Sequence, residues 1–158
     1  MNRDEKLQLV LEICERYGSG QPGALLNILS DISDALRYIP EESIPLIAAH
    51  VSVSENVVKL ICSRSVRYCT DEVGDHLIVV CDGSVCHNRG AVEILQALEF
   101  ALGISDGQTT DDGCFTIKTV SCVGSCANAP LLSIDGAFKG HVRNNDIPKM
   151  IEAIQGGE

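Results

Sequence analysis

Four cysteines in the second half of the chain have types and spacing that suit metal or redox chemistry. Cys81 and Cys86 form a C-x4-C pair, and Cys122 and Cys126 form a C-x3-C pair after a long gap. Each pair follows a segment that reads as a strand, so two loops could deliver two thiolates each to one place. A [2Fe–2S] cluster needs four thiolates on two irons. The spacing therefore favours one such cluster, with these four cysteines as its ligands.

Three other chemistries compete for the same cysteines. Structural zinc favours C-x2-C knuckles, and neither pair has that spacing. A thioredoxin-type dithiol enzyme needs C-x-x-C at a strand-to-helix turn, and no C-x-x-C occurs in the sequence. A Rieske centre needs two histidine ligands, whereas only His87 adjoins a pair. On the residues alone zinc stays open, and His87 is expected outside the ligand set or on the surface.

The remaining cysteines, Cys14, Cys62, Cys69 and Cys114, form no pair of this kind. Cys14 falls on an apolar helical stripe, where a reduced thiol serves as a small apolar side chain. Cys62 and Cys69 invite a second metal site, but one C-x6-C pair without further ligands supports it weakly. We expect all four to be buried or solvated thiols.

Two strands must position the cysteine loops. The apolar run 76–80 is rich in β-branched residues and leads directly into Cys81, and the alternating run 115–120 leads to Cys122. Helical spacing from Ala91 to Leu102 lies between them. Such a crossover makes the strands parallel and places both loops at one end of the sheet.

The loops and the end of the chain carry further signals. Gly83 and Gly124 lie inside the loops, where we expect positive φ and close approach of backbone N–H groups to sulfur. The amino-terminal end of the helix after Cys86 should point at the thiolates and stabilise their charge. Pro130 should fix the exit of the chain from the second loop. A hairpin with an Asp135–Gly136 turn and a helix over 147–154 close the chain.

The first seventy or so residues read as four short amphipathic helices. They are expected over 7–14, 22–36, 46–49 and 52–61, the last with a capping box between Ser52 and Glu55. We therefore predict an α+β (or α/β) chain with two domains: a helical bundle over 1–73, and a mixed-sheet domain in the order β-α-β-β-β-α over 74–158.

Composition narrows the function classes. The chain has 158 residues, 45% hydrophobic and 22% charged, with a formal net charge of −10, so nucleic acid and anionic membrane surfaces are poor partners. No apolar run approaches the roughly 20 residues that span a bilayer, and the first residues lack the pattern of a signal peptide. Eight cysteines without that signal favour metal or redox chemistry over disulfides. We expect a soluble cytoplasmic protein without membrane insertion.

The two cysteine loops resemble those of a known family. The runs Cys81-Asp-Gly-Ser-Val-Cys86-His87-Asn88-Arg89-Gly90-Ala91 and Cys122-Val-Gly-Ser-Cys126-Ala-Asn-Ala-Pro130, with 111–116 before the second, are similar to the small thioredoxin-like [2Fe–2S] subunit of NADH:quinone oxidoreductase (respiratory complex I). That subunit type also occurs in NAD-dependent formate dehydrogenases and electron-bifurcating hydrogenases. The bundle, including 39–42 and 46–48, matches the helical domain of that family, so the resemblance spans nearly the whole chain.

The resemblance implies a thioredoxin-like fold in which Cys81, Cys86, Cys122 and Cys126 ligate one [2Fe–2S] cluster. It also implies docking against a flavoprotein subunit that binds FMN and NAD(H), and against further iron–sulfur subunits, at the periphery of a membrane-bound complex where there is one. This chain has no G-x-G-x-x-G after a strand, so it is not expected to bind nicotinamide itself.

One segment departs from the family pattern. Where the family carries a Gly-Val-Ala-Thr-Phe-Tyr-like stretch, this chain has Lys59-Leu60-Ile61-Cys62-Ser63-Arg64. Because aromatic anchors often dominate interfaces, the loss of both aromatic residues, with Arg64 and Arg67 added, indicates a divergent partner or altered docking.

The leading hypothesis is an electron-transfer subunit of an NAD(H)-linked, flavin-containing oxidoreductase, which exchanges single electrons with FMN or a neighbouring cluster. Such a chain would catalyse no bond chemistry alone and would belong to an enzyme only as a subunit. Two alternatives stay open: a non-catalytic assembly module that holds zinc or no metal, and a free-standing thioredoxin-like ferredoxin.

Overall fold

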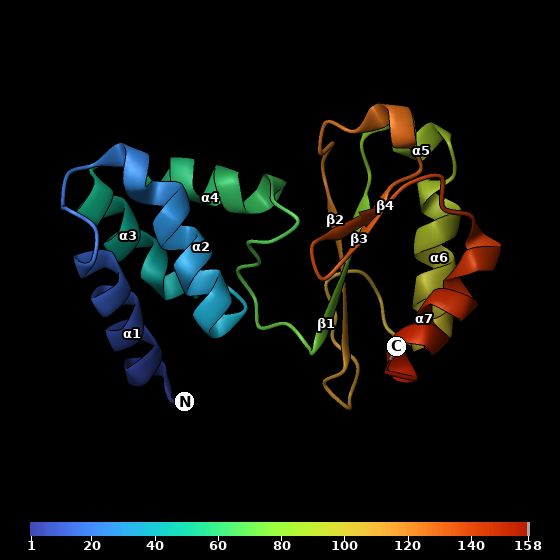
Figure 1. Cartoon of the computed structure of the whole chain (residues 1–158), viewed down its shortest axis with the longest axis horizontal. Helices are drawn as coiled ribbons and strands as arrows, with labels where there is room; N and C mark the ends of the chain where they lie inside the picture. The colour runs from blue at the N-terminus through green and yellow to red at the C-terminus, as the bar shows by residue number, and fades with distance from the viewer. Residues whose placement is uncertain (158) are drawn as a thin grey trace. The chain divides into compact units, whose positions relative to one another are not determined.

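The computed structural model describes residues 1–157. The chain divides into two compact units, Met1–Glu72 and Val73–Glu158 (Figure 1). Separate domains at 1–73 and 74–158 remain a prediction, which expression of each segment alone would test. Within the described residues, no helix combines the length and apolarity needed to cross a membrane.

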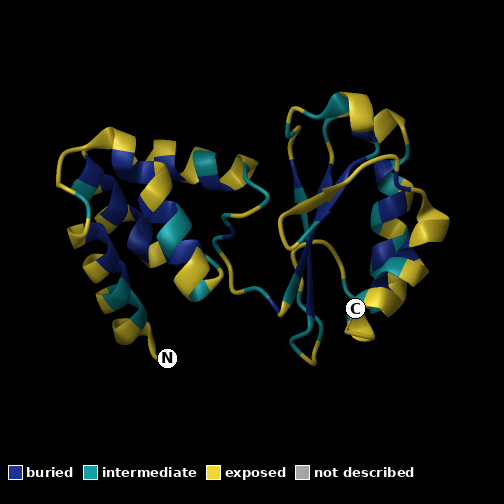
Figure 2. Ribbon diagram, viewed as in Figure 1, coloured by how far each residue is buried: buried dark blue, intermediate teal, exposed yellow. Residues whose placement is uncertain are grey.

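The first unit is built from short helices around one apolar core. In chain order these are α1 (Arg3–Glu15), the 3-10 turn η1 (Pro22–Ala24), α2 (Leu25–Leu36), the 3-10 turn η2 (Glu41–Ser43), α3 (Ile44–Val51) and α4 (Glu55–Arg64). Each of the four α-helices turns an apolar stripe inward; Val10, Ile28, Ile47 and Val58 are completely buried in the shared core. Figure 2 shows the complementary pattern of buried and exposed stripes along these helices. The expected bundle of amphipathic helices is confirmed.

The helix starts differ in part from expectation. Asn2 forms a capping box at α1, with its side chain accepting from Glu5 N–H and the Glu5 carboxylate accepting from Asn2 N–H. The box predicted between Ser52 and Glu55 is wrong. Ser52 instead ends α3 in the left-handed region at φ 59°, and its N–H bonds back to α3. Helix α4 begins after Ser54, which makes no side-chain cap bond.

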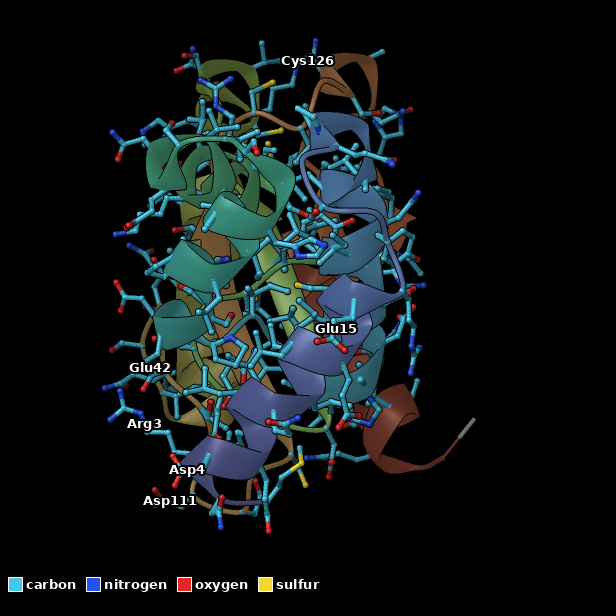
Figure 3. All side chains as sticks on the ribbon, turned by 90° about the vertical axis from the view of Figure 1, so that its left-hand side faces the viewer. Arg3, Asp4, Glu15, Glu42, Asp111 and Cys126 are labelled. Atoms are coloured by element: carbon cyan, nitrogen blue, oxygen red, sulfur yellow. The ribbon has the colours of Figure 1, made fainter. Side chains whose placement is uncertain are left out.

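Charged side chains of α1 form ion pairs and hydrogen bonds with residues far along the sequence in the same unit. Lys6 Nζ donates to Tyr38 Oη at 2.8 Å and pairs with Glu72, and Tyr38 Oη donates to Glu72 Oε1 at 3.0 Å. Arg3 Nε lies 3.1 Å from Glu42 Oε1, and Figure 3 shows these two side chains near each other. The hydrogen bonds from Lys6 and Tyr38 hold the pKa of Glu72 below its usual value. These contacts join the first helix to residue 72, the last of this unit.

The second unit is a four-stranded mixed sheet with helices. Its elements are β1 (His76–Cys81), α5 (Ser84–Asn88), α6 (Ala91–Leu102), β2 (Phe115–Val120), η3 (Cys126–Asn128), β3 (Leu132–Ile134), β4 (Ala137–Lys139), η4 (Asn144–Asp146) and α7 (Ile147–Gln155). The strand order is β2-β1-β3-β4, with β1 parallel to β2 and the other neighbours antiparallel. The predicted mixed sheet and its element order are confirmed.

Packing and turn chemistry explain this sheet. Helices α6 and α7 contact each other, and α6 packs on β1 and β2, so both helices cover one face (Figure 1). Ile78 and Ile117 point into that core and are 1% and 0% exposed. The predicted hairpin turn joins β3 to β4 with positive φ at both Asp135 (51°) and Gly136 (86°), the backbone that a two-residue type I′ turn requires.

Candidate iron–sulfur site

The parallel pair β1 and β2 brings the two cysteine loops together. Cys81 is the last residue of β1 and stands opposite Val120, the last residue of β2; Cys122 follows two residues later. Asp82 N–H donates to Val120 O at 2.8 Å, so the pairing continues into the first loop. In Figure 1, α5 and the 3-10 turn after β2 lie at the same end of the sheet. The predicted placement of both loops at one sheet end is confirmed.

Gly83 makes the closest contact between the loops. A Cβ at this position would lie 2.7 Å from Cys122 Cβ and 3.0 Å from Cys122 Cα, closer than side chains tolerate. Its φ is −64°, so the expected positive φ is wrong here. Glycine is needed for the approach of the second loop and not for the backbone conformation. The sulfur of Cys81 also approaches this loop, 4.0 Å from Ser121 O.

Cys122 and Cys126 form an outer pair. Their Sγ atoms lie 3.4 Å apart, and Gly124 N–H donates to Cys122 Sγ at 3.4 Å. Gly124 has φ 86°, as expected for this turn, and brings a backbone N–H to the sulfur. This N–H and the Cys126 thiol lower the pKa of Cys122, whereas Cys122 raises the pKa of Cys126. Cys122 is exposed and Cys126 is partly buried.

Cys81 and Cys86 form an inner pair. Their residues are only 3% and 2% exposed. Burial raises the pKa of the Cys86 thiol, the hydrogen bond with Cys81 raises it further, and Leu131 N–H lowers it. Cys86 lies inside the short helix α5, whereas a loop followed by a helix was expected; the longer α6 begins only at Ala91. The five residues of α5 are too few to give a periodic signal in the sequence, which accounts for the difference.

The inner and outer pairs affect each other electrostatically. Cys126 raises the pKa of Cys86, and Cys81 raises the pKa of Cys126, because neighbouring thiolates repel. Among residues 1–157 no three His, Cys, Asp or Glu side chains are arranged to hold one metal ion. The four sulfurs form two adjacent pairs, one buried and one nearer the surface. Two thiols for each of two irons is the donor set of a [2Fe–2S] cluster, and the residues fit that group.

The other candidate residues lie outside these pairs. Cys14 and Cys62 are buried in the core of the first unit, and Cys69 is buried outside that core cluster. Cys114 precedes β2, at the end of that strand away from Cys122. His87 is exposed, with Nδ1 2.9 Å from Asp82 Oδ1. This contact joins the two ends of the first loop and was missed from the sequence. The signal for it was an acid directly after one cysteine and a histidine directly after the other.

Comparison with known proteins identifies the family of the chain. Residues 10–155 match the thioredoxin-like [2Fe-2S] ferredoxin family. The chain belongs to this family. It is 33% identical over 130 residues to a subunit of the NADH-quinone oxidoreductase of Pseudomonas aeruginosa, covering 82% of this chain and 78% of that protein. It is 32% identical to the corresponding NADH-quinone oxidoreductase subunit of Aquifex aeolicus, covering 90% of this chain and 91% of that protein.

A solved structure supports the fold of this family member. A chain of an NAD+-reducing [NiFe]-hydrogenase in its H2-reduced state matches with a TM-score of 0.64 at 20% identity. The match covers 90% of this ferredoxin-family chain and 23% of the hydrogenase chain. The match of residues 10–155 to the thioredoxin-like [2Fe-2S] ferredoxin family confirms the predicted thioredoxin-like fold.

Proposed function

We propose that this chain is the [2Fe–2S] electron-transfer subunit of an NAD(H)-linked oxidoreductase complex. Cys81 and Cys86 would hold one iron, and Cys122 and Cys126 the other. The observation that carries the proposal is the convergence of two sulfur pairs at one sheet end in a chain of the [2Fe–2S] ferredoxin family. When bound, the cluster supplies storage and transfer of one electron at a time.

The residues around the sulfurs set the conditions for that transfer. Gly124 N–H and Leu131 N–H donate to the sulfurs of Cys122 and Cys86, one in each pair. Such bonds stabilise negative charge on thiolates and favour reduction of a site that they surround. The formal net charge of −10 acts in the opposite direction, since it disfavours an added electron. The inner pair is buried, while the outer pair lies at the surface where a partner could approach.

The partner that we propose is a flavoprotein subunit carrying FMN and NAD(H), with further iron–sulfur subunits beyond it. The chain would be cytoplasmic and, where the complex is membrane-bound, would lie at its periphery. The relatives from NADH-quinone oxidoreductases are themselves subunits, which supports a multi-subunit assembly. Helix α4 occupies the segment that departs from the family pattern; Leu60 is 55% exposed on it, beside exposed Lys59 and Arg64. An aliphatic and basic surface replaces the aromatic one, so we expect an acidic counterpart on the partner.

Metal content of the purified full chain tests the ligand set. Anaerobically purified wild-type protein should contain about two irons and two sulfides per chain. Cys81→Ala and Cys126→Ala should lose the iron and the visible absorbance. Cys14→Ala removes a buried cysteine from the other unit and is the matched control, so it should keep both. Loss of iron in all three variants alike, or one zinc in place of iron, would contradict the assignment.

Capture of the tagged chain from its native cells tests the assembly separately. A co-purifying flavoprotein that oxidises NADH is the expected result. An iron-loaded chain that carries no flavoprotein would point to the free-standing ferredoxin instead, and would leave the ligand assignment intact.

A further inference from the structure

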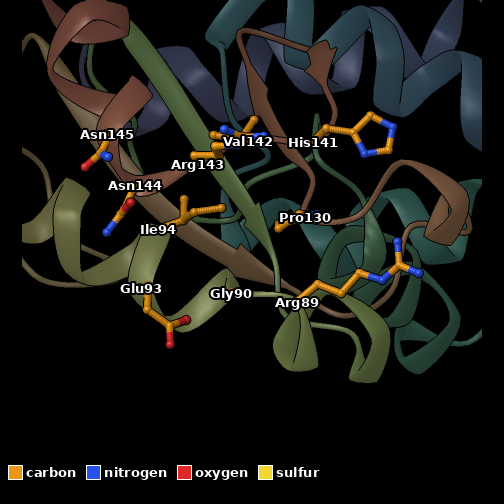
Figure 4. A pocket seen from close by; sticks show the side chains of 10 residues that line it. All are labelled: Arg89, Gly90, Glu93, Ile94, Pro130, His141, Val142, Arg143, Asn144 and Asn145. Carbon is orange, nitrogen blue, oxygen red and sulfur yellow. The ribbon is translucent and has the colours of Figure 1, made fainter.

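A cavity of about 440 Å³ opens on the second unit, beside the two cysteine loops but lined by other residues. Its wall comes from three segments: the turn before α6 with the first turn of that helix, Pro130, and residues 141–145. The lining residues are Arg89, Gly90, Glu93, Ile94, Pro130, His141, Val142, Arg143, Asn144 and Asn145. In Figure 4, Arg89 and His141 extend on one side of Pro130, and Glu93, Asn144 and Asn145 lie on the other.

The lining is positive within an acidic part of the chain. After residue 72 the sequence has eleven acidic residues and five Lys or Arg, and two of those five, Arg89 and Arg143, line this one cavity. Across residues 1–157 no carboxylate lies within ion-pair distance of the Arg89 or Arg143 guanidinium or of the His141 imidazole. Two guanidinium groups without an acidic partner therefore border a concave site.

The backbone adds donors and holds the wall in place. Helix α6 starts at the cavity, and its N-cap residue Gly90 has no side chain to satisfy the first N–H groups. On the opposite wall, His141 N–H donates to Asn128 O at 2.8 Å and Val142 N–H donates to Pro130 O at 3.2 Å. Arg143 N–H donates to Asp146 Oδ2 at 3.0 Å. The segment that carries the second guanidinium is thus fixed on the loop that follows Cys126.

We propose that this cavity binds a small oxyanion, a phosphate- or carboxylate-bearing molecule. Guanidinium groups bind both anions through paired charge-assisted hydrogen bonds, and the Asn144 and Asn145 amides add neutral donors. A volume of about 440 Å³ lies in the range of small-molecule sites. Buried Ile94 and Val142 form an apolar floor for the remainder of the ligand.

Glu93 carries a negative charge in the lining of the cavity, so its removal should change anion affinity in the opposite direction to removal of an arginine. It is the third residue of α6, and its Oε2 lies 3.6 Å from the point that a Cβ on Gly90 would occupy. At that place the carboxylate competes with a bound anion for the free N–H groups at the start of α6, and it also repels that anion. Removing its charge should therefore tighten binding, whereas removing either arginine should weaken it.

Calorimetric titration of the full chain at low ionic strength tests the site, with orthophosphate and citrate as probes and chloride as the control anion. Saturable 1:1 binding of at least one probe is expected. Binding of phosphate would indicate a phosphate site, and binding of citrate would indicate a carboxylate site. Arg89→Gln and Arg143→Gln should weaken it about tenfold or more. Glu93→Gln should tighten it. Lys149→Gln removes the same charge on α7 outside the cavity and should change it less than about twofold.

Three results would overturn the proposal. One is no saturable binding of either probe, and another is an equal loss of binding in Lys149→Gln, which would show only general attraction between charges. The third is binding of an oligoglutamate peptide without binding of phosphate or citrate, which would assign the cavity to a protein partner. The measurement does not need iron in the chain, so its failure is distinct from failure of the cluster assignment.

Discussion

Gly83 is the position at which the smallest change should disturb the cysteine site most. A Cβ there would lie 2.7 Å from Cys122 Cβ and 3.0 Å from Cys122 Cα. Carbon atoms in ordinary contact are about 3.5–4.0 Å apart, so the two loops would have to separate by roughly 1 Å. The φ of −64° is one that alanine adopts without strain, so the effect of the added methyl is steric.

We expect Gly83→Ala to hold less iron and sulfide than wild type. It should also lose about 1–3 kcal/mol of unfolding free energy, the usual cost of overpacking, because main-chain atoms of Cys122 cannot swing away as the tip of a side chain can. Iron and sulfide analysis with visible absorbance measures the first effect. Urea unfolding of the cluster-free protein, followed by circular dichroism, measures the second.

Two other glycines separate this effect from the general cost of replacing glycine. Gly23 has open space around it and no positive φ, so Gly23→Ala adds the same methyl group harmlessly and should keep normal iron content. Gly124 also has open space but φ 86°, so Gly124→Ala should cost about 1 kcal/mol through backbone strain. Full iron content and an unchanged unfolding free energy in Gly83→Ala would contradict this prediction, because they would show that the two loops leave room for a methyl group.

Three further predictions concern stability, each measured by urea unfolding. Asp106 accepts from Thr119 N–H at 2.8 Å and from the Thr119 hydroxyl at 2.7 Å, so Asp106→Ala should lose about 1 kcal/mol; no loss would show that these exposed bonds contribute nothing. The pKa of Glu72 is lowered from 4.5 in the folded protein. The contribution of its ionised carboxylate to the unfolding free energy is therefore present above pH 4.5 and is lost as pH falls through the lowered pKa. Glu72→Gln should therefore have a lower unfolding free energy than wild type at pH 7, and the two values should converge in acid. Ser133 is 1% exposed and its Oγ has no hydrogen-bond partner among the described residues, so Ser133→Ala should be neutral or stabilising.

Local sequence patterns were enough to predict the strands and the meeting of both cysteine loops at one end of the sheet. The run 76–81 is apolar because β1 is central and its residues after His76 are all buried, and 115–120 is paired with it in parallel register. A crossover helix between two strands favours parallel pairing, so the loops after both strands were expected at the same sheet end. The Asp135–Gly136 turn could be predicted equally well, because positive φ at two successive residues restricts the sequence.

Features that depend on distant neighbours could not be predicted in the same way. Gly83 looks like a turn glycine in the sequence, yet what requires it is Cys122, which is 39 positions later and comes from another strand. Cys86 lies in a helix of five residues, too short to give a periodic signal. Ser52 has the residue type and spacing of a helix cap, but the end of α3 already uses it. Gly83 is thus required by tertiary packing, whereas Cys86 and Ser52 were missed because of a short helix and a competing helix end.

The outer position of Cys122 should make it the most reactive site thiol in the cluster-free protein. Cys122 is exposed and its pKa is lowered by Gly124 N–H and Cys126, so more thiolate is present at a given pH. Cys114 is partly exposed, but its hydrogen bond with Asp112 raises its pKa, and burial raises that of Cys86.

Since both Cys122 and Cys114 can be reached by solvent, their opposite pKa shifts provide a matched pair. With iodoacetamide at pH 7, Cys122 should be alkylated first, Cys114 more slowly and Cys86 last, and raising the pH should narrow the gap between the first two. Mass spectrometry of tryptic peptides after timed quenching measures these rates. Equal rates for Cys122 and Cys114 at pH 7 would mean that Gly124 N–H does not reach the sulfur, and the turn that supports the outer pair would then be wrong.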